Sequence, residues 1–228
     1  MDQFYPFEVI PFPHFSMMPC CDPNTLYLHY GQHYHSEVDR LNRLVVRHRL
    51  THLSLEELLT VDINLPVAQV SQIRDAAGSV YNHQLYFDSI AANALPPHGP
   101  LATQLIATYG SMERFFRLLS EAAESIAGSG WVWLVAEENG ALHLVVTRDN
   151  LTPALSAVRP IFVIDLWEHA FFPMNHFDKS TYLFTWFSTL DWAKANQRFL
   201  LSRTLQQFPG RVLPDHPAAL PPVSHRQR

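Results

Sequence analysis

Apolar residues recur at helical spacing through the first half of the chain. Within residues 24–48 they stand three to four positions apart, which predicts a long helix that begins near Asn24, a possible N-cap. The positions at this interval are Leu26, Tyr30, His33, Glu37, Leu41 and Leu44. "SLEELL" has the capping-box spacing of Ser54 and Glu57 and predicts a short helix. Further helices are expected over residues 66–91 and 98–127, the latter broken near Gly110.

The pattern changes after Gly128 and then becomes helical again. "GWVWLVAEENGALHLVVTRD" places two apolar runs around "EENG", which predicts a β-hairpin, and "PIFVID" predicts a third strand that ends at Asp165. Helical spacing returns over residues 179–206. The predicted fold class is therefore α+β, with a helical N-terminal domain (1–92) followed by an α+β C-terminal domain (93–206). Residues 207–228 are rich in proline, so we expect an extended or disordered tail.

Composition narrows the range of functions. The 228 residues are 47% hydrophobic and carry a formal charge of −5, so they can fill a core but offer no long basic run for nucleic acid. The adjacent Cys20 and Cys21 are the only cysteines, which excludes a disulfide scaffold. No signal peptide or membrane-length apolar run is seen, and the sequence thus predicts a cytoplasmic protein with no membrane partner.

Histidine is the residue type that could carry chemistry. "LYLHYGQHYH" holds three histidines in seven residues, and His29, His83 and His169 each lie among aromatic residues. Together with Asp165, four residues before His169, they form a set of nitrogen and oxygen donors that suits iron, manganese or zinc. Any one of them alone is better explained as a buried histidine satisfied by a hydrogen bond. The residues by themselves leave both interpretations open.

Four motifs together resemble one known family. "LYLHYGQHYH", "YNHQLYF", "GSGWVWLV" and "DLWEHAFF" occur in the order and spacing of the iron/manganese superoxide dismutases. The resemblance covers about residues 10–200 and implies a helical-hairpin domain joined to an α+β domain with a three-stranded antiparallel sheet. It implies that the metal ligands are His29, His83, Asp165 and His169. The implied cofactor is one iron or manganese ion per subunit.

The resemblance also implies roles for residues around the metal. Trp131 and Trp167 match aromatic positions that line the family site, and Glu168 matches a glutamate that reaches the partner subunit's metal-binding histidine. A homodimer is therefore expected. The implied substrate is superoxide, which the family converts to oxygen and hydrogen peroxide.

Several positions near the metal depart from the family pattern. Glu37 replaces a tyrosine that gates the substrate funnel, and it could repel an anion when ionised or relay protons when neutral. The glutamine that bonds the metal-bound solvent in family members is replaced at both of its possible positions, by Ser79 and by Asn150. Either the shorter Asn150 amide or a water is expected to take its place. The choice between iron and manganese cannot be read in the usual way.

Other departures lie toward the expected dimer interface and funnel. His33 keeps a family histidine, but its usual tyrosine partner is Phe172, which removes a hydroxyl. Lys179 replaces an arginine near the funnel mouth. His35 and His176 are extra histidines that we expect at the surface.

Three functions follow as hypotheses. The leading one is a dimeric superoxide dismutase in which Glu37, His33 and Asn150 assist catalysis. The second is a divergent metal-binding paralogue with little dismutase activity and a structural or partner-binding role. The third is another oxidative reaction, such as peroxidase or oxygenase chemistry, at the same metal.

Overall fold

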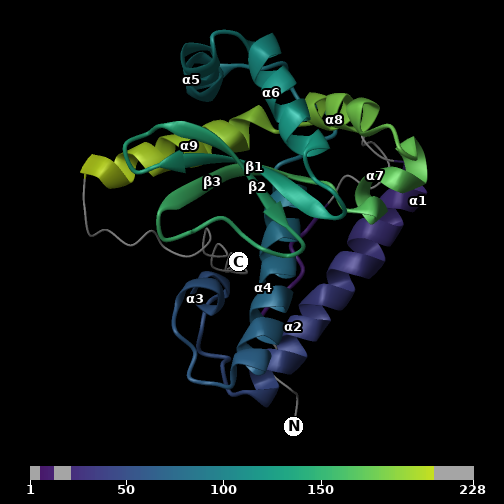
Figure 1. Cartoon of the computed structure of the whole chain (residues 1–228), viewed down its shortest axis with the longest axis vertical. Coiled ribbons are helices and arrows are strands. Elements are labelled where there is room, and N and C mark those ends of the chain that lie inside the picture. Colours follow the sequence, from purple (N-terminus) through teal and green to yellow (C-terminus); the bar gives the residue numbers. More distant parts are fainter. Residues whose placement is uncertain (1–5, 13–21, 208–228) are drawn as a thin grey trace, which may run out of the picture.

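The computed structural model describes residues 6–12 and 22–207, which form a long helical hairpin beside a mixed helix and sheet region (Figure 1). The predicted α+β fold class is confirmed. In the hairpin, the first arm is continuous and the second is a single long helix. The elements of the hairpin are α1 (Pro23–Leu26), a π-helical segment η1 (Tyr27–Tyr34), α2 (His35–Arg47), α3 (Leu55–Thr60) and α4 (Val67–Asp88). Cys20, Cys21 and the predicted tail from residue 208 onward lie outside the described residues.

The first arm differs from the prediction in two details. The N-cap is Asp22 and not Asn24, because the Asp22 carboxylate accepts a hydrogen bond of 2.8 Å from the backbone N–H of Thr25. The arm is also not α-helical throughout, because η1 is a π-helix, in which backbone hydrogen bonds span five residues. Segments of this kind often mark functional sites, and this one carries His29 and His33.

Apolar side chains fix the two arms against each other. Val38, Leu41 and Val45 of α2 belong to one buried core with Ile73 and Ala77 of α4. The short helix α3 begins with the predicted capping box: the Ser54 N–H donates to Glu57 at 2.8 Å, and the Glu57 N–H donates to the Ser54 hydroxyl at 3.3 Å. The apolar contacts hold α2 against α4.

The three predicted strands form one antiparallel sheet, as expected. They are β1 (Gly130–Glu137), β2 (Leu142–Arg148) and β3 (Val158–Asp165), in the order β2-β1-β3. The central strand β1 is buried along almost its whole length, which explains its unbroken apolar run. Trp131 of β1 pairs with Asp165 of β3, so the sheet register brings an indole beside the carboxylate.

The remaining helices pack around the sheet (Figure 1). They are α5 (Gly99–Tyr109), α6 (Met112–Glu124), α7 (Glu168–Asn175), α8 (Lys179–Ser188) and α9 (Trp192–Gln207). The helical spacing predicted over residues 179–206 corresponds to two helices, α8 and α9, because the chain leaves helical geometry between Ser188 and Trp192. Leu190 there forms an isolated antiparallel bridge with Ile90. None of the helices within the described residues combines the length and apolar character needed to cross a bilayer.

Candidate metal centre

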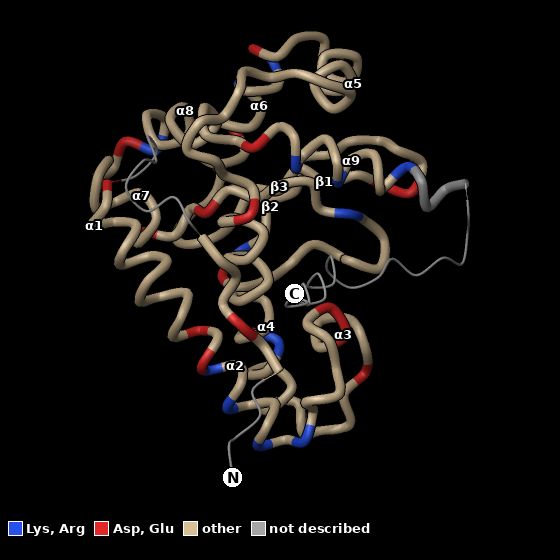
Figure 2. The backbone as a smooth tube through the Cα atoms, turned by 180° about the vertical axis from the view of Figure 1, so that it is seen from behind, with Lys and Arg blue, Asp and Glu red and all other residues tan. Residues whose placement is uncertain are grey.

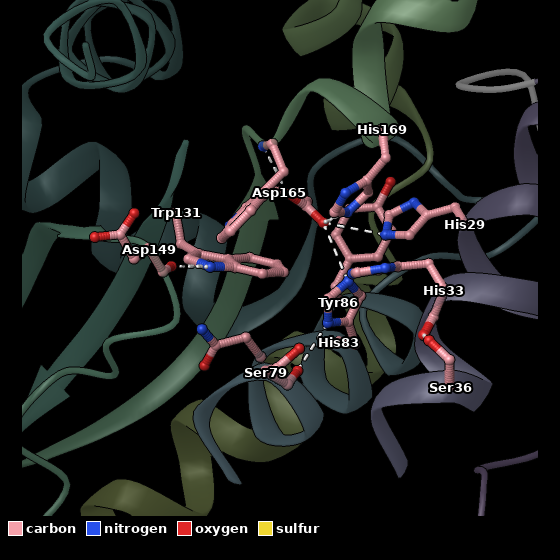
Figure 3. Close-up of polar contacts among 12 residues, drawn as sticks. His29, His33, Ser36, Ser79, His83, Tyr86, Trp131, Asp149, Asp165 and His169 are labelled. Atoms are coloured by element: carbon pink, nitrogen blue, oxygen red, sulfur yellow. Dashed lines mark hydrogen bonds and ion pairs between the residues drawn. The ribbon is translucent and has the colours of Figure 1, made fainter. Parts of the chain in front are cut away.

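Four side chains from four elements converge at one point between the hairpin and the sheet (Figure 3). His29 comes from η1, His83 from α4, Asp165 from the last position of β3 and His169 from α7. One potential ligand atom from each residue lies within 4.8 Å of all the others. The residues that were predicted as ligands are thus brought together by segments up to 140 positions apart.

The Asp165 carboxylate lies at the middle of this cluster. Its Oδ2 atom is 3.1 Å from Nε2 of His29, 3.2 Å from Nε2 of His169 and 3.6 Å from Nε2 of His83. Its other oxygen, Oδ1, accepts a hydrogen bond of 2.8 Å from the backbone N–H of Trp167. That bond, at the strand-to-helix turn, fixes the orientation of the carboxylate and directs Oδ2 toward the three imidazoles.

The tautomer of His83 follows from its hydrogen bond. Its Nδ1 lies 2.7 Å from the backbone carbonyl of Ser79, and a carbonyl can only accept, so Nδ1 carries the proton. Nε2 of neutral His83 is then left with a free lone pair inside the cluster. Such a bond to the outer nitrogen is the usual support of a metal-bound histidine.

Two buried nitrogen atoms in the cluster have no hydrogen-bond partner among the described residues. They are Nε2 of His29 and Nε2 of His83. The His29 atom approaches the Asp165 carboxylate at 3.1 Å, but without the angular geometry of a hydrogen bond. Unpaired buried polar atoms are rare because they cost desolvation energy. A cation bound by these two nitrogen atoms and by Asp165 would satisfy all of them, so the donor set fits a metal ion.

The electrostatics of the cluster favour neutral imidazoles around one carboxylate. Burial lowers the pKa of His29 to about 4 and the pKa of His83 well below its ordinary value of 6.5. Burial alone would raise the pKa of Asp165, but the neighbouring His169 and His29 hold it well below its usual range. At neutral pH the cluster therefore offers two neutral buried imidazoles and a carboxylate, the protonation states that metal binding requires.

The metal-free protein is expected to lose stability as pH falls from about 6.5 to about 4. In this window the unfolded chain binds a proton at His29 while the folded chain does not, so the free energy of unfolding falls. His29 alone accounts for roughly 3 kcal/mol. Urea denaturation at pH 7 and pH 4.5 measures this loss, with His29→Gln as the matched variant. An equal pH dependence in both proteins would contradict the assignment.

Two tryptophans form walls of the cluster. Trp131 is fully buried, its ring lies edge-on to His83 at 5.0 Å, and its Nε1 donates to the carbonyl of Asp149 at 2.8 Å. Trp167 stacks on His169 with ring centroids 5.8 Å apart. Nε1 of Trp167 is buried and has no partner within the described part of the chain, so it remains a free donor beside the site.

His33 extends the cluster toward solvent. Its ring centroid is 4.2 Å from that of His169 and 5.0 Å from that of His83, and its side chain is partly exposed. His35 and His176 are both exposed, as expected. Of the histidines near the motifs, His33 is thus the additional one that lies directly against the predicted ligands.

Glu37 and Asn150 are held by partners that the sequence interpretation did not include. Arg40 donates to Glu37 at 2.9 Å and to Asp75 of α4 at 2.5 Å. The Asn150 amide donates to the other oxygen of Asp75 at 3.0 Å. Glu37 is therefore an ion-paired carboxylate. The Asn150 side-chain amide is directed at Asp75, and whether this amide or a water takes the place of the family glutamine stays a prediction.

The remaining predicted residues belong to α7 and to the first position of α8. Glu168 is exposed and accepts a hydrogen bond of 2.9 Å from Ser129 of the same chain. The Phe172 ring is 39% exposed and contacts Phe177. The Lys179 amine donates to the carbonyl of Ile126 at 3.3 Å and lies over the Phe171 ring. Their predicted roles at the interface and funnel stay predictions.

Comparison with known proteins agrees with this geometry. The family model for the α-hairpin domain of iron/manganese superoxide dismutases matches residues 4–91, and the model for their C-terminal domain matches residues 97–198. Three histidines and an aspartate that meet at one point of such a fold are typical of a metal-binding protein. The chain belongs to the iron/manganese superoxide dismutase family.

Individual relatives are distant but cover most of the chain. Superoxide dismutase [Fe] of Entamoeba histolytica is 29% identical over 80% of this chain and 93% of its own length. Superoxide dismutase [Mn] 3 of Leptolyngbya boryana is 31% identical, over 83% of this chain and 80% of its own. Superoxide dismutase [Mn/Fe] 2 of Staphylococcus aureus is 26% identical over 83% of this chain and 94% of its own. The names of these three relatives give different metals: iron, manganese, and manganese or iron.

Proposed function

We propose that this protein is a superoxide dismutase whose single iron or manganese ion is held by His29, His83, Asp165 and His169. The observation that carries the proposal is the pair of buried Nε2 atoms of His29 and His83, which have no hydrogen-bond partner in the described part of the chain and lie beside one shared carboxylate. Family membership supplies the reaction. Relatives named for iron, for manganese and for both metals support a redox ion at this position.

The bound ion would supply redox chemistry, taking an electron from one superoxide and returning it to a second, which leaves as hydrogen peroxide after taking up two protons. The residues of the chain would hold the ligands in place and shape the surroundings of the ion. Ser79 and the Trp167 N–H orient two of the ligands. The buried Trp131 and the partly buried Trp167, which contact His83 and His169, would exclude water from the inner side of the site.

A second candidate is a divergent paralogue that binds metal with little dismutation. The ion pair of Glu37 with Arg40 and the contact of Asn150 with Asp75 favour it, because both side chains stand where family members carry groups that act on metal-bound solvent. Other oxidative chemistry at the same ion is a variant of this candidate. A peroxide-dependent oxidation assay with a broad panel of donors tests it.

Separate reconstitution with iron and with manganese distinguishes these candidates. Superoxide decay is followed by stopped flow on each preparation, and the bound metal is determined on the same sample. We expect turnover far above background with at least one metal. Turnover at background with full occupancy of both metals would support the paralogue and reject the dismutase.

We also propose a homodimer that uses the face around α7. The elements η1 and α7 contact each other, and they and the segment after α7 carry exposed apolar residues: Tyr27, Leu28, Phe172, Met174 and Phe177. Glu168 and His33 border the same region, in the role that the family resemblance gives them. Sedimentation equilibrium distinguishes a dimer from a monomer, and Phe177→Ser is expected to weaken the dimer because this ring is 87% exposed in one chain.

A further inference from the structure

A chain of polar contacts joins the two arms of the hairpin next to the candidate metal centre. It consists of Glu37, Arg40, Asp75 and Asn150, and we refer to it as the Arg40 bridge. Arg40 donates one guanidinium nitrogen to Glu37 of its own helix and another to Asp75 of α4. Asp75 accepts in turn from Asn150, which follows β2. The bridge therefore links the helix that follows His29, the helix that carries His83 and a loop of the sheet domain.

The Glu37 end of the Arg40 bridge lies next to the side from which a small molecule can reach the metal centre. The side chains of His29, His83 and Asp165 are almost completely buried, whereas that of His169 is 24% exposed and His33 is partly exposed. Approach is therefore past His33 and His169. Glu37 is four residues, one helical turn, beyond His33.

The charge of Glu37 is felt at His33. Glu37 follows His33 by one helical turn, and its side chain is only 14% exposed, so solvent screens its charge only in part. A carboxylate that acts on the partly exposed imidazole also acts on an anion that passes the same ring, and repels it. Without a counterion, Glu37 and Asp75 together would place two negative charges on this side of the cluster.

We propose that Arg40 is a positioning residue that keeps this approach open to superoxide by neutralising Glu37 and holding its carboxylate in the bridge. The inference rests on the proposed function. Arg40 brings the net charge of the bridge from −2 to −1 and binds both carboxylates through a planar fork, which a point charge would do less well. It acts through Glu37 and does not itself contact the predicted ligands in the described residues.

Arg43 provides a matched control within the same helix. Arg40, Arg43 and Arg47 line a groove of about 380 Å³ along α2, with Leu44 and Gln72. Figure 2 shows Lys and Arg positions along the lower part of α2. Arg43 is exposed and makes no ion pair among the described residues. Its removal changes the net charge of the protein as much as removal of Arg40, but not the charge balance of Glu37 and Asp75.

Azide binding to the oxidised, metal-loaded protein is the test, because azide is a small anion whose binding is seen in the absorption spectrum. For Arg40→Gln we expect azide affinity to fall roughly three- to tenfold at low salt, as a partly screened unit charge implies. The difference should shrink at high salt. For Arg43→Gln the expected change is less than about twofold. Equal effects of the two variants, or none for Arg40→Gln, would overturn the proposal.

Two further variants separate charge from folding. Glu37→Gln combined with Arg40→Gln restores the net charge of the bridge, and azide affinity should return to within about twofold of the unmodified protein. Asp75→Asn leaves Arg40 in place and removes one negative charge, so azide should bind equally well or more tightly. It serves as the test if Arg40→Gln does not fold. Weaker azide binding in either variant would reject the role of Arg40.

The readout is independent of turnover. If the unmodified protein binds azide in an Arg40-dependent manner but does not consume superoxide, the proposed function fails and the role of Arg40 in anion access stands. If superoxide is consumed and azide affinity does not depend on Arg40, the proposed function stands and the inference fails.

Discussion

Replacing His83 with alanine is expected to abolish stoichiometric metal binding. The substitution removes a buried Nε2 whose lone pair points into the cluster, and it also removes the Nδ1–H that anchors the ring to Ser79. Loss of a group that only supports a ligand commonly costs 10- to 100-fold in metal affinity, and loss of the ligand itself costs more. The variant should retain less than roughly a tenth of an ion per chain after dialysis against a chelator.

His35→Ala is the matched control for this experiment. His35 also lies on a hairpin helix near the cluster, but it is exposed and its ring contacts Tyr30 and Tyr34. It should retain as much metal as the unmodified protein. Circular dichroism of both variants shows whether they fold. A folded His83→Ala protein with one ion per chain would remove His83 from the ligand set.

Gly78→Ala is expected to destabilise the fold by roughly 3 kcal/mol, at the upper end for an overpacked site. A Cβ at this position of α4 would lie 2.0 Å from the backbone carbonyl oxygen of Asn150, so the loop after β2 must move. Alanine normally stabilises a helix relative to glycine by about 1 kcal/mol, but this gain is far smaller than the cost of the clash. The shift would also displace the Asn150 amide from Asp75.

Gly31→Ala is the control for the glycine substitution. The atoms nearest to its Cβ would be those of the Tyr27 ring, at 3.2 Å and beyond, and that side chain is 53% exposed and can rotate away. We expect a change in the free energy of unfolding of less than about 1 kcal/mol. Urea denaturation of both variants measures the difference. Equal stability of the two proteins would show that the α4 surface at Gly78 is not in close contact with the loop.

Local patterns predicted much of the fold. The capping box at Ser54 and Glu57, the hairpin around "EENG" and the strand that ends at Asp165 all depend on residues close in sequence, and the structure contains each of them. The break after Ser188 was missed because it depends on a bridge to Ile90, about 100 residues away. The helical spacing of apolar residues continues through this segment, so the pattern alone does not reveal the break.

The candidate site was also predicted only in part from the sequence. The four convergent residues were identified because four motifs resemble one family, although no local pattern shows that His29 and Asp165 meet. The sequence interpretation of Glu37, as a group that repels an anion when ionised or relays protons when neutral, did not include its ion pair with Arg40. Arg40 follows three residues later, at a spacing that allows an ion pair, and this signal was available. The contact of Arg40 with Asp75 depends on packing of α2 against α4, which the sequence does not show.

Titration of the metal-free protein with iron or manganese tests the central claim most directly, with bound metal and superoxide turnover measured at each point. The account predicts that, with the active metal, turnover rises in proportion to the bound ion and that both reach a plateau at one ion per chain. A plateau of one ion per chain with turnover at the level of free metal, for both metals, would contradict it.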